Sequence, residues 1–309
     1  MPSNSKEIKR RIKSVGNIGK ITKAMELVSA AKMRKAQLAA TASRPYSKLS
    51  SELLQNLVAK ADLSHHPLIQ RVLPEDDPEA TVGAGKVPVQ KILAILISSD
   101  RGLAGAFNSN VVNKAIALIK NEEFSAGGGP ASGWDFITVG KKGADTARRL
   151  GYNIVASFPA KDKVDLNDAT TIAEVAMQDF LAWKYEKVFV IYTDFVSTLV
   201  QKPNVMQLLP FERTQVTGDR LQNDDFLFEP NADAVLETLI KRTVEFAVYQ
   251  ALVEAAASEH SARMVAMRNA NEAAGDLIED LTLSYNQARQ SGITRELSEI
   301  SAAKLAMEG

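Results

Sequence analysis

The stretch ALVEAAASEHSARMVAMRNANEAA, at residues 251–274, is the centre of the longest helical run in this sequence. From residue 232 to about residue 306 the chain contains no proline, and only Gly275 and Gly292 interrupt residues that favour helix. At a rise of about 1.5 Å per residue, a continuous helix of roughly 75 residues would be about 110 Å long. A globular domain does not need a helix of that length, so the run predicts a rod.

Small residues dominate the predicted apolar line of this helix, which lets a partner helix approach closely and predicts a thin shaft. The line comprises Leu236, Leu239 or Ile240, Val244, Ala247, Ala251, Ala255, Ala262, Ala266, Ala270, Ala273, Leu277, Leu281, Ala288, Ile293, Leu297 and Ile300.

A second helix is predicted at the other end of the chain, from Asn4 or Ser5 to about Lys60. Pro45 predicts a kink there or a break after Ser43. Neither terminal helix has another apolar surface in the chain to pack against, so we expect the two to pair as an antiparallel coiled coil. Apolar residues of the first helix recur at a period close to that of a coiled coil, at Ile8, Ile12, Val15, Ile18, Ile21, Met25 and Val28.

Between the two ends, strands and helices alternate. Strands are predicted at 91–98, 134–139, 152–156 and 187–195, helices at 108–123, 140–150 and 168–183, and an extended segment interrupted by Pro203 at 198–210. This alternation predicts a mostly parallel sheet with helices on both faces. The predicted fold is therefore α/β, a long antiparallel coiled coil of the N- and C-terminal helices with an inserted Rossmann-like α/β domain. Its segments are a coiled-coil helix at 1–60, a linker loop at 61–90, the Rossmann-like domain at 91–211, a linker at 212–231 and a coiled-coil helix at 232–309.

Composition excludes several classes of chemistry. The 309 residues contain no cysteine, so disulfides, thiolate metal sites and a cysteine nucleophile are ruled out. No run of 18 apolar residues occurs, so no membrane-spanning helix is predicted. The N-terminus is basic and amphipathic like a transit peptide, but its pattern continues past residue 30 and predicts mature structure.

The first segment is strongly basic. Residues 1–37 contain ten Lys and Arg against two Glu, whereas the whole chain balances 37 basic against 37 acidic residues. This asymmetry predicts an acidic partner, which could be nucleic acid, a membrane surface or a protein. A membrane-surface helix would need bulky Trp, Phe or Leu anchors, and DNA-binding domains are usually basic as a whole. Acidic loops of a protein partner are therefore favoured, and a nucleic-acid-binding coiled coil stays an alternative.

A catalytic or cofactor site finds little support. The turn at 98–108 joins a strand to a helix, as phosphate-binding loops do, but it matches neither glycine motif, and Phe107 would crowd a pyrophosphate. A nucleotide-binding enzyme is therefore the third and weakest hypothesis. The adjacent His65 and His66 point apart and predict an exposed loop, and His260 lies inside a helix. No catalytic residue, cofactor or metal is predicted.

Three groups of motifs resemble the γ subunit of F-type ATP synthases. At the N-terminus these are IKRRIKSV (8–15), ITKAM (21–25) and VSAAKMRKAQ (28–37), and in the middle SDRGL (99–103) with NSN (108–110). At the C-terminus they are SEHSARMVAMRNA (258–270) and LSYNQARQ (283–290), followed by IT (293–294) and EL (296–297). Ala104 and Ala106 depart from the family pattern, as do Asn271 and Ala273.

The resemblance implies a noncatalytic rotor shaft. In this family the coiled coil stands inside an α3β3 ring whose β subunits hold the catalytic sites, and the inserted domain contacts the ε subunit and the c-ring. Proton flow turns the c-ring and the shaft, which drives ATP synthesis. The resemblance implies a peripheral protein at the cytoplasmic face of the bacterial inner membrane, rather than in a mitochondrial matrix, with no nucleic-acid partner. It also implies subunit contacts at Lys23, Met25, Arg289, Gln290 and Thr294.

Overall fold

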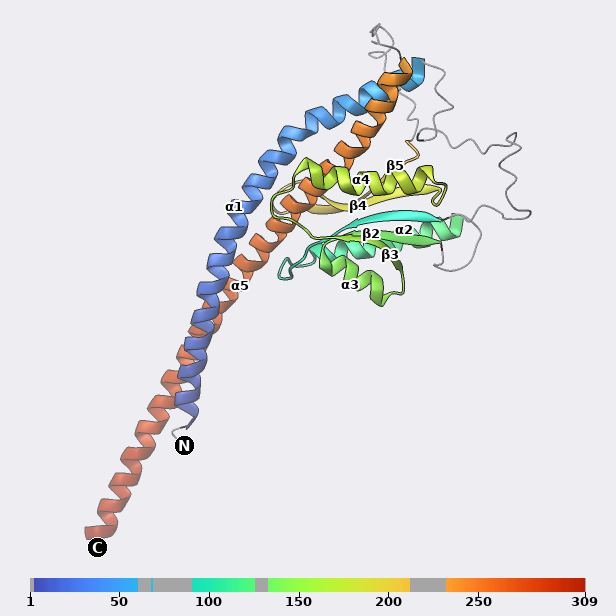
Figure 1. The fold of residues 1–309 in the computed structure, drawn as a ribbon. Helices are drawn as coiled ribbons and strands as arrows, with labels where there is room; N and C mark the ends of the chain where they lie inside the picture. The colour runs from blue at the N-terminus through green and yellow to red at the C-terminus, as the bar shows by residue number, and fades with distance from the viewer. Residues whose placement is uncertain (1–2, 61–67, 69–90, 126–132, 212–231, 309) are drawn as a thin grey trace. The chain divides into compact units, whose positions relative to one another are not determined.

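The computed structural model describes residues 3–60, 68, 91–125, 133–211 and 232–308 (Figure 1). The chain divides into two compact units. The first, here called the helical unit, comprises residues 1–30 and 263–309, and the second, the sheet unit, comprises residues 31–262. The predicted linkers at 61–90 and 212–231 lie outside the described residues except for Leu68, so the predicted segment boundaries stay a proposal.

Both terminal helices are continuous, as the sequence predicted. Helix α1 runs from Ser3 to Lys60 and helix α5 from Ala232 to Glu308. Of the two outcomes predicted at Pro45, a kink or a break after Ser43, the break is wrong, because α1 continues through Pro45. Pro45 is exposed, so water can solvate the carbonyl group that its missing N–H leaves without a helical hydrogen bond.

The sheet unit contains a five-stranded sheet with the strand order β3-β2-β1-β4-β5. The strands are β1 Ile92–Ile97, β2 Trp134–Val139, β3 Asn153–Phe158, β4 Lys187–Phe195 and β5 Gln201–Leu209. Strands β1 to β4 are parallel, whereas β5 pairs antiparallel with β4. Pro203 lies within β5 opposite Thr193, and an edge strand tolerates its missing N–H. The predicted mostly parallel sheet is confirmed.

Helices cover both faces of the sheet, also as predicted. The helices between strands are α2 Phe107–Ser125, α3 Lys141–Arg149 and α4 Leu166–Leu181. On one face, Ile172 of α4 and Ile240 and Val244 of α5 pack against β1 and β4. On the other face, Val111 and Ile119 of α2 pack against the opposite side of the same strands. Part of α5 therefore belongs to the core of the sheet unit.

Candidate functional site: the paired terminal helices

In the helical unit, α1 and α5 pack side by side in opposite directions. Gly16 of α1 lies against Ile278, Gly19 lies against Asn271 and Ala274, and Glu26 binds Arg268. As residue numbers rise along α1, those of their partners fall along α5. The antiparallel pairing predicted from the sequence is therefore confirmed within this unit.

Small and polar side chains form the interface between the two helices. Thr22, Glu26 and Ser29 are buried on α1, at the alternating spacing of 4 and 3 that keeps residues on one face. On α5, Met267 and Ala274 are buried, and the half-buried Asn271 and Ile278 continue the same alternation. These residues, together with Gly16 and Gly19, are here called the seam.

Only part of each apolar line predicted for the interface lies beside the seam, since Ile8, Ile12, Val15 and Met25 of α1 are half-buried. Ile18, Ile21 and Val28 are 51%, 59% and 55% exposed, so their predicted burial against α5 is wrong. On α5, Ala273 and Leu277 are likewise exposed. Each of these residues precedes a seam residue by one position, which places it about 100° around its helix. The helix pair therefore turns apolar side chains outward, where nothing else in the helical unit covers them among the described residues.

Glu26 is the charged centre of the seam. Its carboxylate is 7% exposed, accepts a hydrogen bond from Lys23 Nζ at 2.9 Å, and lies 3.4 Å from Arg268 Nε. The hydrogen bond from Lys23, supported by that from Arg268, holds the pKa of Glu26 below its usual value of 4.5 against the opposing effect of burial. Glu26 therefore stays ionised at neutral pH and links α1 to α5. A sequence search for apolar residues could not find it.

The predicted contact residues fall at two levels of the helix pair. Lys23 and Met25 lie near the Glu26 link, with Lys23 exposed and Met25 half-buried. Arg289, Gln290 and Thr294 are exposed on α5 about 18 residues or more beyond that level, which at about 1.5 Å per residue is roughly 30 Å along the helix. The five residues therefore do not form one site, and a partner that touches all of them must extend along the helices.

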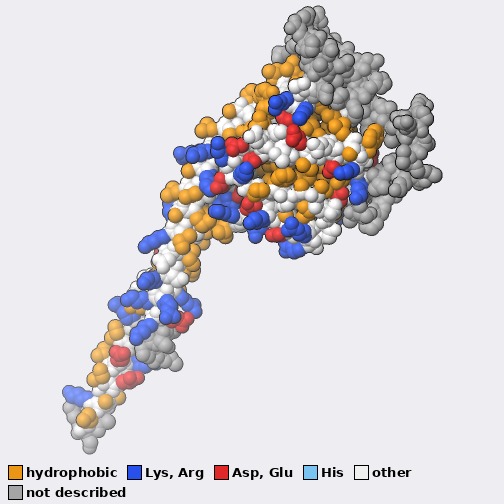
Figure 2. Space-filling view, in the orientation of Figure 1, with side chains coloured by type: hydrophobic (Ala, Val, Ile, Leu, Met, Phe, Trp, Pro, Cys, Tyr) orange, Lys and Arg blue, Asp and Glu red, His pale blue; other side chains and the backbone are white. Residues whose placement is uncertain are grey.

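The C-terminal part of α5 extends beyond its partner helix. Because Gly16 faces Ile278, the start of α1 at Ser3 falls opposite about residue 291 of α5. Ile293, Leu297 and Ile300, which the sequence placed on the interface, are therefore exposed, which corrects that prediction. Figure 2 shows hydrophobic side chains interspersed with Lys and Arg along the helix pair. An exposed apolar stripe of this kind marks a protein interface.

The turn between β1 and α2 is closed by its own side chains. Asn108 Oδ1 accepts a hydrogen bond from the Ser99 amide at 3.0 Å, and Asp100 Oδ1 accepts one from the Lys141 amide at 3.0 Å. Phe107 is buried. The Ser99 amide of the turn is thus engaged by the neutral Asn108 side chain, and the Asp100 carboxylate, bonded to the first amide of α3, would repel an anion.

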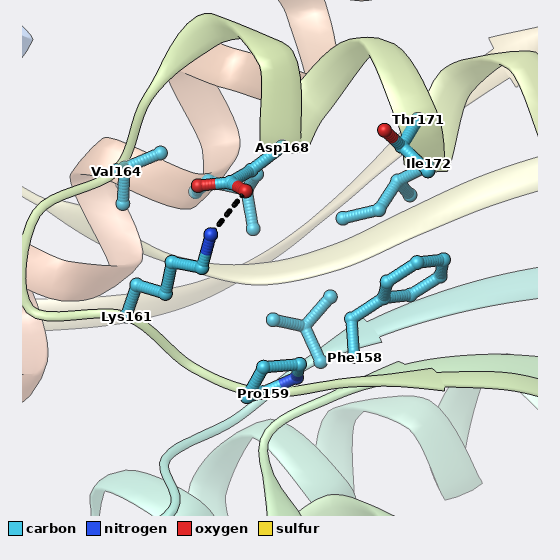
Figure 3. A pocket seen from close by; sticks show the side chains of 9 residues that line it. Phe158, Pro159, Lys161, Val164, Asp168, Thr171 and Ile172 are labelled. Atoms are coloured by element: carbon cyan, nitrogen blue, oxygen red, sulfur yellow. Dashed lines mark hydrogen bonds and ion pairs between the residues drawn. The ribbon is translucent and has the colours of Figure 1, made fainter.

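A pocket of about 240 Å³ opens where β2 and β3 end beside α4 (Figure 3). Its lining is mostly apolar and includes Phe158, Val164 and Ile172. Lys161 and Asp168 point toward each other and pair at 2.7 Å, so their charges neutralise each other. The pocket lies apart from the β1–α2 turn and offers no free charge to orient a nucleotide.

Among the residues that the structure describes, no group of His, Asp and Glu is arranged to hold a metal ion. Within the same residues, no helix is long and apolar enough to cross a membrane. His65 and His66 lie outside the described residues. His260 is buried on α5, with its Nε2 3.7 Å from Asp162 Oδ1.

Comparison with known proteins settles the family. The ATP synthase family model matches residues 4–307. The ATP synthase gamma chain of Pelotomaculum thermopropionicum is 40% identical over 309 residues and covers 100% of both chains. This chain belongs to the ATP synthase gamma-chain family. The gamma chain of Herpetosiphon aurantiacus is 41% identical over 313 residues and covers 99% of both chains.

Solved rotors of this family share the fold. A chain of the Euglena gracilis mitochondrial ATP synthase, in a structure of OSCP, F1 and the c-ring, superposes with a TM-score of 0.67 at 18% identity. That match covers 99% of this chain and 95% of the other. A central-stalk chain of the Tetrahymena thermophila enzyme gives a TM-score of 0.56 at 22% identity, covering 81% and 99%. This chain therefore shares its fold with chains of two solved ATP synthases.

Proposed function

We propose that this chain is the central rotor shaft of a proton-translocating ATP synthase, noncatalytic itself. It couples rotation of the c-ring to the conformational cycling of the catalytic β subunits, in ATP synthesis and hydrolysis. One observation supports this role beyond the family membership. The helix pair of the helical unit has a seam rich in small and polar residues, and it turns several large apolar side chains outward, among them Ile18, Ile21 and Val28.

An outward apolar surface on a two-helix rod suits a shaft inside a ring. The pair cannot bury Ile18, Ile21 and Val28 by itself, so a surrounding protein must cover them. The α5 residues beyond the start of α1 need the same cover. Because these side chains lie on particular faces of the rod, its surface is asymmetric about its axis. Rotation of the rod therefore presents a different surface to each surrounding subunit, as a rotor that changes their conformations in turn must do.

The implied partners are the α and β subunits of the α3β3 ring, the ε subunit and the c-ring, with membrane association only through the complex. Lys23, Met25, Arg289, Gln290 and Thr294 are the proposed contacts with the ring, at the two levels described above. The gamma-chain relatives are bacterial, which supports a place at the cytoplasmic face of the inner membrane.

Co-purification tests the rotor role. A tagged form of this chain should bring down α and β subunits at about three copies of each per copy of the chain. The purified chain alone should not hydrolyse ATP. A chain that co-purifies with no ring subunit, or that turns over ATP by itself at an enzyme-like rate, would refute the proposal.

Charge reversal at Arg289 should impair coupling without unfolding the chain. Arg289 is exposed, so Arg289→Glu is expected to change the free energy of unfolding by less than about 0.5 kcal/mol. If Arg289 meets acidic loops of the ring, proton-driven ATP synthesis should fall several-fold while complex assembly is retained. The measurement is ATP synthesis in membrane vesicles, normalised to assembled complex.

Lys23 needs a different substitution, because it binds Glu26. A reversal there would place two carboxylates together in the seam, whereas Lys23→Gln removes the charge without that repulsion. Lys120→Glu, a reversal of the same sign at an exposed position of α2 in the sheet unit, is the control for a general charge effect. Equal ATP synthesis in Arg289→Glu and the unaltered complex would remove Arg289 from the proposed contacts.

A further inference from the structure

One polar cluster joins three elements of the sheet unit. Arg44 of α1 lies with Nε 3.0 Å from Glu254 Oε1 of α5. Its Nη2 donates a hydrogen bond to the Phe195 carbonyl oxygen at 3.2 Å, and lies 3.9 Å from Asp194 Oδ1 at the end of β4. A single guanidinium therefore connects both terminal helices to the central sheet.

Hydrogen bonds from the helices complete the cluster. Gln250 Nε2 donates to Glu254 Oε1 at 2.7 Å, and Ser43 Oγ donates to Gln250 Oε1 at 2.6 Å. Glu254 is 5% exposed, whereas the Arg44 side chain is 50% exposed and that of Asp194 35%. The cluster thus has a buried carboxyl at its centre and a solvent-facing side.

The two carboxyl groups compete for one cation. Asp194 Oδ1 lies 3.9 Å from Arg44 Nη2 and Glu254 Oε1 lies 3.0 Å from Arg44 Nε, so one guanidinium faces two carboxyl groups. If both are ionised, the cluster has a net charge of −1, with Glu254 held away from water.

We propose that Arg44, Asp194 and Glu254 form a proton-dependent clasp that fastens β4 to both terminal helices and loosens when the buried Glu254 loses its proton. The clasp does not depend on the rotor role, because its parts all lie in the sheet unit and its test reads amide exchange in the full chain.

Burial, followed by the nearby Asp194 carboxyl, raises the pKa of Glu254 above its usual value of 4.5. Arg44 and Gln250 oppose this rise and do not overcome it. Tyr192 also faces the cluster, and burial with the nearby Glu254 charge raises its pKa to about 12, so Tyr192 stays neutral. The described titratable or charged groups around Glu254 are therefore Arg44 from α1 and Tyr192 and Asp194 from β4.

The raised pKa of Glu254 determines the direction in which the stability of the clasp changes with pH. A carboxyl whose pKa is raised in the folded state adds stability below its unfolded pKa, and this contribution is lost as the pH rises through the folded pKa. The clasp should therefore be tightest in mild acid and weaker at alkaline pH. Ordinary paired carboxylates change in the opposite direction, which makes the behaviour of the clasp distinctive.

Hydrogen exchange of the full chain tests the clasp. After correction for the intrinsic pH dependence of exchange, protection of peptides covering β4 and residues 248–258 should fall at least about threefold from pH 5 to pH 8, relative to peptides covering β2. Glu254→Gln mimics the protonated form, because its amide can donate to Asp194. It should keep the protection seen at pH 5 across the whole range, and Asp194→Asn should do the same.

Asp179→Asn is the matched control, since Asp179 is a largely buried carboxylate of α4 that pairs with Lys184 at 2.6 Å. It should retain the pH dependence of the unaltered chain. Flat protection in the unaltered chain, or an undiminished pH dependence in Glu254→Gln, would overturn the proposal. If Glu254→Gln does not fold, the pH dependence of protection in Asp194→Asn decides instead. Failure of both variants to fold would also count against the proposal, because a mimic of the protonated form should be tolerated.

Discussion

Gly140→Ala is expected to destabilise the sheet unit by about 3–5 kcal/mol, a large part of the stability of a typical domain. Gly140 joins β2 to α3 with φ +90°, a region that residues with a Cβ rarely adopt. A Cβ there would lie 2.3 Å from the Ser98 carbonyl oxygen and 2.6 Å from its carbonyl carbon. These are backbone atoms at the end of the central strand, so neither can move aside without disturbing the sheet.

Two other glycines separate the causes of this effect. Gly151 has φ +83° with no atom within 4 Å of its Cβ position, so Gly151→Ala should cost only backbone strain, about 1 kcal/mol. Gly102 has neither a positive φ nor a close neighbour, so Gly102→Ala should be nearly neutral. Urea unfolding of the full chain, followed by tryptophan fluorescence, gives the three values. A cost at Gly140 no greater than that at Gly151 would show that the Ser98 contact does not matter.

The sequence predicted the fold well because the signals for its elements are long-range and redundant. The absence of proline after Pro230 predicted the long helix α5. Short apolar runs such as that of β1 predicted strands that are buried on both faces. The antiparallel direction of β5 was harder to predict. Pro203 indicated an interrupted segment, whereas β5 is a strand that tolerates proline because it lies at the edge of the sheet.

The interface between the helices was predicted less well, for a physical reason. On both helices two neighbouring lines have coiled-coil spacing, and part of the more apolar line is exposed. Ile18 and Ile21 precede Gly19 and Thr22, and only the second pair lets the helix backbones approach closely. A shaft that must present an apolar surface to a partner reverses the usual rule that the most apolar face is internal. Close packing of small residues and one buried ion pair then hold the helices together.

The buried Glu26 link gives the second large prediction. Glu26→Lys should weaken the helical unit by about 2 kcal/mol or more, because it replaces two favourable pairs by repulsion from Lys23 and Arg268 inside the seam. Both partners are about half exposed, so solvent screening keeps the cost below that of a fully buried pair. Glu26→Gln should cost less, since its amide still accepts a hydrogen bond.

Glu7→Lys is the matched control, because Glu7 pairs with Arg11 on the exposed surface of the same helix and should contribute under about 0.5 kcal/mol. Hydrogen exchange of peptides covering residues 19–30 and 263–275 measures the effect in the full chain. If Glu26→Lys and Glu7→Lys exchange alike, the link does not hold the helices together.

The pH dependence of the Glu26 link should be opposite to that of the clasp. Because Lys23 and Arg268 lower the pKa of Glu26, its contribution is present above the unfolded pKa of 4.5 and is lost as the pH falls through the folded pKa. Protection of the seam should therefore decrease below about pH 4.5 in the unaltered chain, and Glu26→Gln should remove that part of the decrease. Acid would then loosen the helical unit while it tightens the attachment of β4, so one exchange experiment across pH distinguishes the two carboxyl groups. Seam protection in Glu26→Gln that falls as steeply in acid as in the unaltered chain would assign the decrease to other carboxylates.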